Sequence, residues 1–253
     1  MFKRMESLDK RNTTRTLGES IMIDISKYGR KAYSQRGEDG MIECVLKELG
    51  IDKGWCCEFG AWDGVHLSNV YNLIVQGWNA VLIEGDKEKY ADLLKNMYDF
   101  PHVCTHNSYV SLEPEQLLDD ILNLYVQTEL DILSIDIDSY DYWVWKSLVH
   151  KPKLVVIEYN SNWKESVTVP YDINHKGWAG NSYFGASATA LRDLGEKKGY
   201  DLIGFQPYTN LFFLRKDLNK ERFKIHDLSD GTHIQTPHHG PMTKEQKNKM
   251  VTV

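Results

Sequence analysis

The sequence predicts an α/β protein with a doubly wound, mostly parallel sheet of seven strands that ends in an antiparallel hairpin. Between residues 55 and 160, short apolar segments alternate with amphipathic, helical ones. Strands separated by helices pair in parallel and are covered on both faces. Two further strand-like segments, between residues 200 and 216, are joined by a short turn, so they must pair antiparallel. The 253 residues, 42% of them hydrophobic, can fill the core of one large domain or two small ones.

Local patterns place the elements in order along the chain. Ile42, Val45, Leu46 and Leu49 recur at helical spacing, and Gly50 ends that helix. The expected strands are WCCEF, AVLIEGD, HVCTHNS, DILSIDID, KLVVIEYN, YDLIGFQP and TNLFFLRKDL. The further expected helices are SNVYNLIVQGW, KEKYADLLKNMYDF, SLEPEQLLDDILNLYV, YWVWKSLV and ATALRDLGEKKGY. In SLEPEQLLDDILNLYV, the opening serine is expected to cap the helix, with Glu in its first turn.

The chain divides into three parts. Residues 33–218 are expected to form the folded domain, with an irregular, aromatic-rich insert near 161–184; residues 1–32 form an N-terminal arm and residues 219–253 a C-terminal tail. The opening segment lacks the apolar region of a secretory signal, and no apolar run reaches the roughly 20 residues needed to span a bilayer. We therefore expect a cytoplasmic protein whose four cysteines are free thiols. Its net charge of -6 argues against nucleic acid as the main partner.

Polar residues gather where the parallel strands are expected to end. In open α/β sheets, ligands bind beyond the carboxyl ends of the strands, near the point where the strand order reverses. Acidic residues stand at four of the five ends, which folding alone does not explain. The strand-end residues are Glu58, Gly60, Asp63 and Gly64; Glu84, Gly85 and Asp86; His106, Asn107 and Ser108; Asp136 and Asp138; and Glu158 and Asn160.

The first two strand ends indicate which ligand this edge holds. Gly60 and Gly64 let a ligand lie against the turn, and Glu84 can accept hydrogen bonds from both hydroxyls of a ribose. A dinucleotide site has the spacing G-x-G-x-x-G, whose glycines let a pyrophosphate rest on a helix N-terminus. Here the spacing is G-x-x-x-G, and the carboxylates of Glu58 and Asp63 would repel a pyrophosphate. They suit a ligand that carries an ammonium and a sulfonium, namely S-adenosylmethionine (SAM).

Six segments in order resemble the FkbM-type family of class I SAM-dependent methyltransferases. They are SQRGEDG, EFGAWDGVHLSN, GWNAVLIEGD, LSIDIDSYDYWVW, VVIEYN and YFGASATAL, and the resemblance covers about residues 33–216. It implies a Rossmann-like sheet and O-methylation of a hydroxyl group, as in family members associated with capsules and other polysaccharides. The family more often has Asp-Glu-Gly after the fourth strand, where this chain has DIDSYDY.

The resemblance also implies a cofactor site, position by position. The amino-acid end of SAM would lie at the first strand end, the ribose at Glu84 and the adenine near Asn107 and Ser108. Gln35, with Glu38, either folds over this site as a lid or belongs to a helix cap. The full set implied for SAM is Gln35, Glu58, Gly60, Asp63, Gly64, Ser68, Asn69, Glu84, Gly85, Asp86, Asn107, Ser108 and Asp136.

Methyl transfer to a hydroxyl, which is a weak nucleophile, calls for a base or a metal ion. Asp136, Asp138 and Glu158 end neighbouring strands, and such oxygen ligands favour a divalent cation such as Mg²⁺, Mn²⁺ or Ca²⁺. In the alternative interpretation, Asp136 contacts SAM or a helix N-terminus, and Asp138 and Asp141 cap the following helix. His175 in the insert is a candidate general base, with Asp138 as its competitor, and either could act alongside a metal.

The expected function is therefore SAM-dependent O-methylation of a carbohydrate hydroxyl, with a nucleotide-activated sugar for a capsule or other surface polysaccharide as the acceptor. Aromatic residues of the insert can stack on a sugar or nucleobase: Trp163, Tyr171, Trp178 and Tyr183. The alternatives are a lipid or secondary-metabolite acceptor, and a non-catalytic partner protein that binds SAM or a nucleotide. A homo-oligomer is compatible with the sequence.

Overall fold

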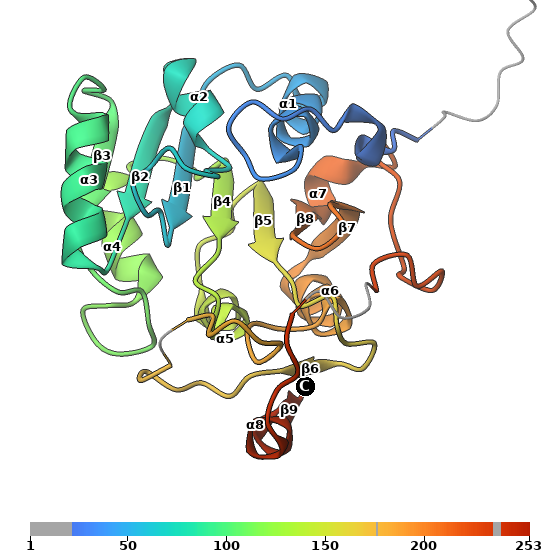
Figure 1. The fold of residues 1–253 in the computed structure, drawn as a ribbon. Helices are drawn as coiled ribbons and strands as arrows, with labels where there is room; N and C mark the ends of the chain where they lie inside the picture. The colour runs from blue at the N-terminus through green and yellow to red at the C-terminus, as the bar shows by residue number, and fades with distance from the viewer. Residues whose placement is uncertain (1–21, 176, 235–238) are drawn as a thin grey trace, which may run out of the picture.

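A computed structural model describes residues 22–175, 177–234 and 239–253 of the chain. Its main sheet has the strand order β3-β2-β1-β4-β5-β8-β7 (Figure 1). Neighbouring strands pair in parallel except β8, which is antiparallel to β5 and β7. The strands are β1 (Trp55–Phe59), β2 (Asn79–Ile83), β3 (Val103–His106), β4 (Ile132–Ile135), β5 (Leu154–Glu158), β7 (Tyr200–Phe205) and β8 (Asn210–Arg215). The predicted fold, a doubly wound, mostly parallel sheet of seven strands with a terminal antiparallel hairpin, is confirmed.

Helices cover both faces of the sheet, and each face has its own apolar core. Side chains of α1, α2 and α3 pack with Cys56 and alternate strand residues on one face. Those of α4, α5 and α6 pack with Cys57 and its counterparts on the other face. The helices are η1 (Ile25–Tyr28), α1 (Glu38–Leu49), α2 (Tyr71–Val75), α3 (Lys87–Met97), α4 (Leu118–Tyr125), α5 (Asp141–Ser147), α6 (Ala188–Lys198), α7 (Lys216–Asn219) and α8 (Lys244–Lys249).

Helix boundaries agree with the sequence at α1 and differ at α4. Gly50 ends α1 in the left-handed region, at φ 68°, as its position predicted. The predicted cap of α4 by Ser111 is wrong, because the helix begins only at Leu118. Ser111 instead accepts a hydrogen bond from the Glu113 N–H and donates one to the Gln116 side chain, which closes a turn. Glu115 explains the delay, because its φ of 66° lies in the left-handed region, and Pro114 also disfavours a helical conformation at Glu113.

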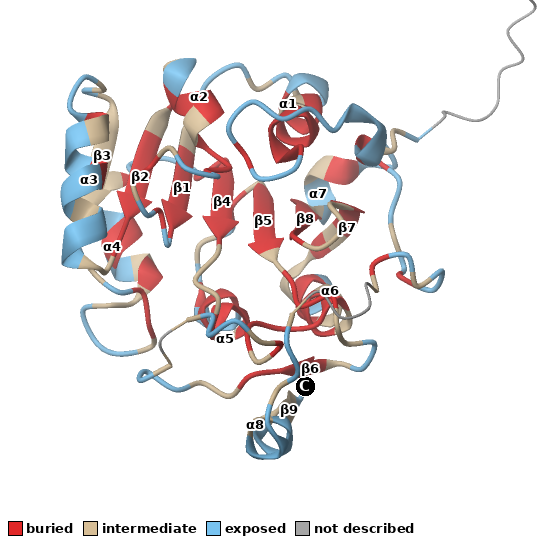
Figure 2. Cartoon of the chain, in the orientation of Figure 1, coloured by how far each residue is buried: buried red, intermediate tan, exposed pale blue. Residues whose placement is uncertain are grey.

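The insert and the C-terminal segment form a small layer beyond the carboxyl ends of β4 and β5 (Figure 1). Strand β6 (Val167–Thr168) pairs antiparallel with β9 (Val251–Thr252), and a further bridge joins Asn181 to Gly240. The segment after residue 219 therefore packs back on the domain. Helix α8 has no buried residue, as Figure 2 shows.

Two further observations concern the cysteines and the possibility of a membrane-spanning helix. All four cysteines are free, as expected, and Cys56 and Cys57 point into opposite cores. Across the residues that the structure describes, we find no helix with the length and apolar character needed to span a membrane.

Candidate functional site

The turn after β1 contains the two glycines that we expected to make room for a ligand. Both have positive φ, 74° at Gly60 and 77° at Gly64. A Cβ at Gly60 would lie 1.9 Å from the Asp136 carbonyl oxygen, and one at Gly64 would lie 2.5 Å from a methyl of Leu93. The protein's own packing therefore requires glycine at both positions. Through Gly60, the turn lies directly against the end of β4.

Two buried glutamates at the ends of β1 and β2 are tied to the loops around them. Glu58 accepts hydrogen bonds from the Ser68 hydroxyl at 2.5 Å and from the Asn69 N–H at 2.9 Å. Glu84 accepts from the N–H groups of Trp62 and Asp86, at 2.8 and 2.7 Å. Burial raises the pKa of Glu58 despite its donors. Both carboxylates are thus oriented before any ligand binds.

The other predicted cofactor residues of this half lie in the same loops. Asp63 accepts from two N–H groups of its own turn, and Asp86 caps α3 through the N–H groups of Glu88 and Lys89. The Asn107 amide donates to the Glu84 carbonyl, which joins the ends of β2 and β3. Gly85 lies against the ring of Tyr109, and Ser108 donates to the Tyr109 carbonyl.

The segment before α1 lies beside this turn, since Ser34 bridges to Leu67. Its acids hold it in place. Asp39 accepts from three successive backbone N–H groups and from the Ser34 hydroxyl, all through one oxygen. Glu38 accepts from the N–H groups of Arg36 and Gly37, and from the side chains of Thr209 and Asn210. Glu38 therefore fixes the segment, while Gln35 is exposed at its tip.

Two buried acceptor atoms in this half have no donor among the described residues. They are Oδ1 of Asn69 and Oδ1 of Asp39. The Asn69 side chain donates to Ser134 on β4, and its N–H donates to Glu58, so the first atom lies in the polar network of the β1 end. A buried acceptor without a partner costs free energy unless a ligand or water supplies a donor. An ammonium group, as in the amino-acid end of SAM, fits this arrangement of acceptors.

The ends of β4 and β5 bring three predicted carboxylates together. Asp136, Asp138 and Glu158 each offer an oxygen that lies within 4.8 Å of those of the other two. Burial, followed by repulsion from neighbouring acids, raises the pKa of Asp136 and Glu158 well above the usual range. Burial also raises the pKa of Asp138, which shares a hydrogen bond with Glu158. Such a group favours bound protons or a cation, and carboxylate oxygens are the ligand type that Mg²⁺ and Mn²⁺ prefer.

The loop that carries Asp138 is held by Asp141 at the start of α5. Asp141 accepts from the Ile137 N–H at 2.9 Å and from the Ser139 N–H at 3.0 Å. Asp138 lies between these two N–H groups with φ 55°. The alternative that Asp138 and Asp141 cap α5 is wrong, because the N-cap is Tyr140 and no side chain caps the helix. Asp141 holds the preceding loop instead, and Asp138 is left to face the acid cluster.

Gly177 of the insert approaches Asp138. A Cβ at Gly177 would lie 3.6 Å from the Ile137 carbonyl oxygen and 3.8 Å from Cβ of Asp138. Nδ1 of His175 accepts from the Gly177 N–H, its ring lies 5.5 Å from that of Tyr183, and burial lowers its pKa. Both candidate bases therefore belong to one region of the molecule.

The remaining aromatic residues of the insert lie in different environments. The hydroxyl of Tyr171 accepts from the Leu112 N–H and donates to Glu113, so it ties the insert to the loop after β3. Nε1 of Trp163 is buried and has no acceptor among the described residues. Trp178 is 49% exposed, whereas Trp163, Tyr171 and Tyr183 are partly buried. It is therefore the most accessible of the predicted stacking residues.

Asn210 is a site residue that sequence reasoning missed. It pairs with Glu158 across β5 and β8, so the two side chains share a face of the sheet. Its Nδ2 donates to Glu38, and its buried Oδ1 has no donor in the described chain. The only signal in the sequence is a polar residue at the start of the strand TNLFFL. Asn160, by contrast, is used structurally, because it donates to the carbonyls of Ser182 and Phe184.

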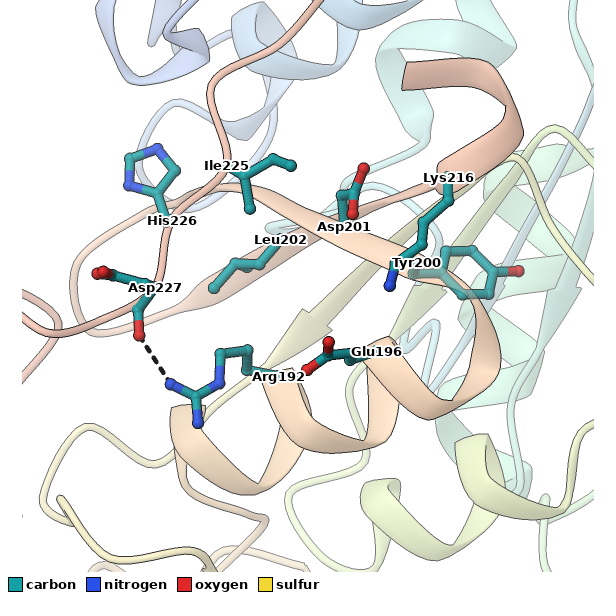
Figure 3. A pocket seen from close by; sticks show the side chains of 9 residues that line it. All are labelled: Arg192, Glu196, Tyr200, Asp201, Leu202, Lys216, Ile225, His226 and Asp227. Atoms are coloured by element: carbon teal, nitrogen blue, oxygen red, sulfur yellow. Dashed lines mark hydrogen bonds between the residues drawn. The ribbon is translucent and has the colours of Figure 1, made fainter. Parts of the chain in front are cut away.

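A cavity of about 280 Å³ lies apart from the strand ends, where α6 and β7 meet the segment before residue 228 (Figure 3). Arg192 closes one side by donating to the Asp227 carbonyl. The lining mixes both signs of charge and includes none of the strand-end acids; it consists of Arg192, Glu196, Tyr200, Asp201, Leu202, Lys216, Ile225, His226 and Asp227. We therefore place the candidate site at the strand ends.

Comparison with known proteins finds similar folds only. No family model matches the sequence, and no curated protein matches it. The N-terminal domain of EvdMO1 with S-adenosylhomocysteine (SAH) bound gives a TM-score of 0.48 at 11% identity, over 76% of this chain and 83% of that one. M. capricolum TrmK in complex with SAH gives 0.42 at 13% identity, over 73% and 72%. A TehB-like SAM-dependent methyltransferase from Corynebacterium glutamicum gives 0.42 at 13%, over 76% and 92%. Similarity this distant carries no argument about activity.

Proposed function

We propose that this protein is a SAM-dependent O-methyltransferase that acts on a carbohydrate hydroxyl, with a nucleotide-activated sugar as acceptor. The observation that carries the proposal is the division of the strand-end edge into two adjoining sites. At β1 and β2, preoriented carboxylates and the free Oδ1 of Asn69 suit the ribose and the ammonium of SAM. At β4 and β5, three clustered acids suit the activation of a hydroxyl.

SAM supplies a methyl group that its sulfonium already activates, so the protein's task is to position the acceptor and remove its proton. Asp138 and His175 are the groups that can take this proton as the acceptor oxygen bonds to the methyl carbon, while the bond from that carbon to the sulfonium sulfur breaks and SAH is released. The pKa of Asp138 is raised and that of His175 is lowered. Asp138 is the stronger candidate, because Asp141 holds its loop on both sides.

A divalent cation is the second part of the proposal. Asp136, Asp138 and Glu158 would hold it, and its charge would lower the cost of deprotonating a hydroxyl beside it. It would also relieve the repulsion that raises the pKa values of these acids.

The test is mass spectrometry of nucleotide sugars incubated with the protein and SAM, in which we expect one acceptor to gain the mass of a single methyl group. Calorimetry should first detect binding of SAM or SAH. Glu84→Ala should weaken that binding about tenfold or more, because charged hydrogen bonds to the ribose are lost, while Glu88→Ala on the exposed face of α3 serves as the matched control. Failure of a well-folded sample to bind SAM or SAH would overturn the proposal.

The principal alternative is an acceptor that is a lipid or a secondary metabolite. Including these classes in the same assay distinguishes them, since only the acceptor changes. A non-catalytic SAM-binding protein would bind SAH and methylate nothing. The acid cluster argues against that alternative, because binding of the cofactor alone has no need of three mutually repelling carboxylates.

A further inference from the structure

One exposed aromatic residue beside Glu84 is held in an unusual way. Trp62 has φ 50°, a conformation that bulky residues seldom adopt, and its side chain is 47% exposed. Its N–H donates to Glu84, the predicted ribose residue. Strained backbone that directs a large ring toward solvent is favoured when the ring has a task there.

The turn around Trp62 is rigid, so the ring is presented in a fixed place. The Gly64 N–H donates to the Ala61 carbonyl at 2.7 Å, and the Ala61 N–H donates to β2. Asp63 accepts from the N–H groups of Val65 and His66, while its own carbonyl accepts from Asn96 on α3. A rigid aromatic platform loses little conformational entropy when a ligand binds to it.

Two basic side chains lie beside the indole. Nζ of Lys89 lies 4.7 Å from the ring centroid, and the His66 ring lies 5.3 Å away at an interplanar angle of 65°. Lys89 makes no ion pair with a carboxylate of the described residues, which leaves its charge available. Gly60, two residues before Trp62, lies against the Asp136 carbonyl, so the indole belongs to the turn that contacts the acid cluster.

We propose that Trp62, His66 and Lys89 form the subsite for the nucleoside diphosphate part of the acceptor. The nucleobase stacks on Trp62, the phosphates bind Lys89 and His66, and the sugar reaches the cluster of Asp136, Asp138 and Glu158. Stacking on an aromatic ring tolerates different bases, and the ammonium supplies charge-assisted hydrogen bonds to phosphate oxygens. This inference rests on the proposed function, since it names the chemistry of the acceptor.

The test is calorimetry with uridine diphosphate and guanosine diphosphate, in the presence of saturating SAH so that the cofactor site is filled. We expect binding, and we expect Trp62→Ala and Lys89→Glu each to weaken it about tenfold or more. Lys87→Glu makes the same charge change two residues earlier in α3 and should leave the affinity within about twofold. Uridine and pyrophosphate, tested separately, should each bind more weakly than the diphosphate.

SAH affinity, measured on the same variants, separates this inference from the function on which it rests. If SAH binds but neither diphosphate does, the subsite is refuted and the methyltransferase proposal stands. If Trp62→Ala weakens SAH instead of the diphosphates, the indole belongs to the cofactor site and the inference fails. Absence of SAH binding would refute the proposed function itself.

Discussion

The acids at the ends of β1 and β2 differ sharply from those at the ends of β4 and β5. In the first region, Glu58, Glu84 and Asp86 each accept two hydrogen bonds from backbone or hydroxyl groups. In the second region, Asp136 and Glu158 accept none from a backbone N–H of the described chain. They face each other and Asp138.

The difference teaches which acids build the structure and which remain available for chemistry. Carboxylates that accept N–H bonds hold loops in place and contribute to stability. Acids that repel one another in a partly buried place cost stability, and their retention indicates a functional role. The protein therefore contains a set of structural acids and a set of reactive acids along the same edge.

The largest expected effect follows from neutralising a reactive acid. Asp138→Asn should lower the rate of methyl transfer about 100-fold or more, since a general base or metal ligand is lost. It should also raise the unfolding temperature, because repulsion in the cluster falls. Initial rates by mass spectrometry and thermal unfolding measure both, and Asp99→Asn, which changes an exposed acid after α3, is the control. An unchanged rate would remove Asp138 from the chemistry.

The next largest effect is that of a divalent cation, which should stabilise the protein through the acids of the second region only. Mg²⁺ or Mn²⁺ should raise the unfolding temperature of the metal-stripped protein. At a concentration 100 times the dissociation constant, the added free energy of unfolding should be about 2.7 kcal/mol. Glu158→Gln, which removes one oxygen ligand of the cluster, should abolish most of this shift. Glu84→Gln, which changes an acid outside the cluster, should retain it. Equal shifts in the wild type and in Glu158→Gln would place any bound cation elsewhere.

The sequence predicted the sheet well because alternating strands and helices allow few arrangements, and the carboxyl ends of parallel strands must meet at one edge. It therefore brought Asp136, Asp138 and Glu158 together correctly. It could not predict which acids are satisfied, because that depends on loop conformations such as the positive φ of Trp62 and Leu67. The sequence did not predict Asn210 as a site residue for a related reason, since its place opposite Glu158 arises from the pairing of β5 with β8.

The smallest expected effect tests the comparison most directly. The same change, Glu to Gln, should shift the free energy of unfolding in opposite directions in the two regions. Glu58→Gln should destabilise the fold by about 1–3 kcal/mol. The Ser68 hydroxyl oxygen already accepts from the N–H groups of Val70 and Tyr71, so its hydrogen points to Glu58. Because the Asn69 N–H donates to the other oxygen of Glu58, an amide NH₂ would meet a donor in either orientation. Glu158→Gln should instead stabilise the apo protein, because it removes a carboxyl group whose ionisation is disfavoured by burial and by the neighbouring acids. Denaturant unfolding of both variants decides the matter, and shifts of the same sign would mean that the two sets of acids are not distinct.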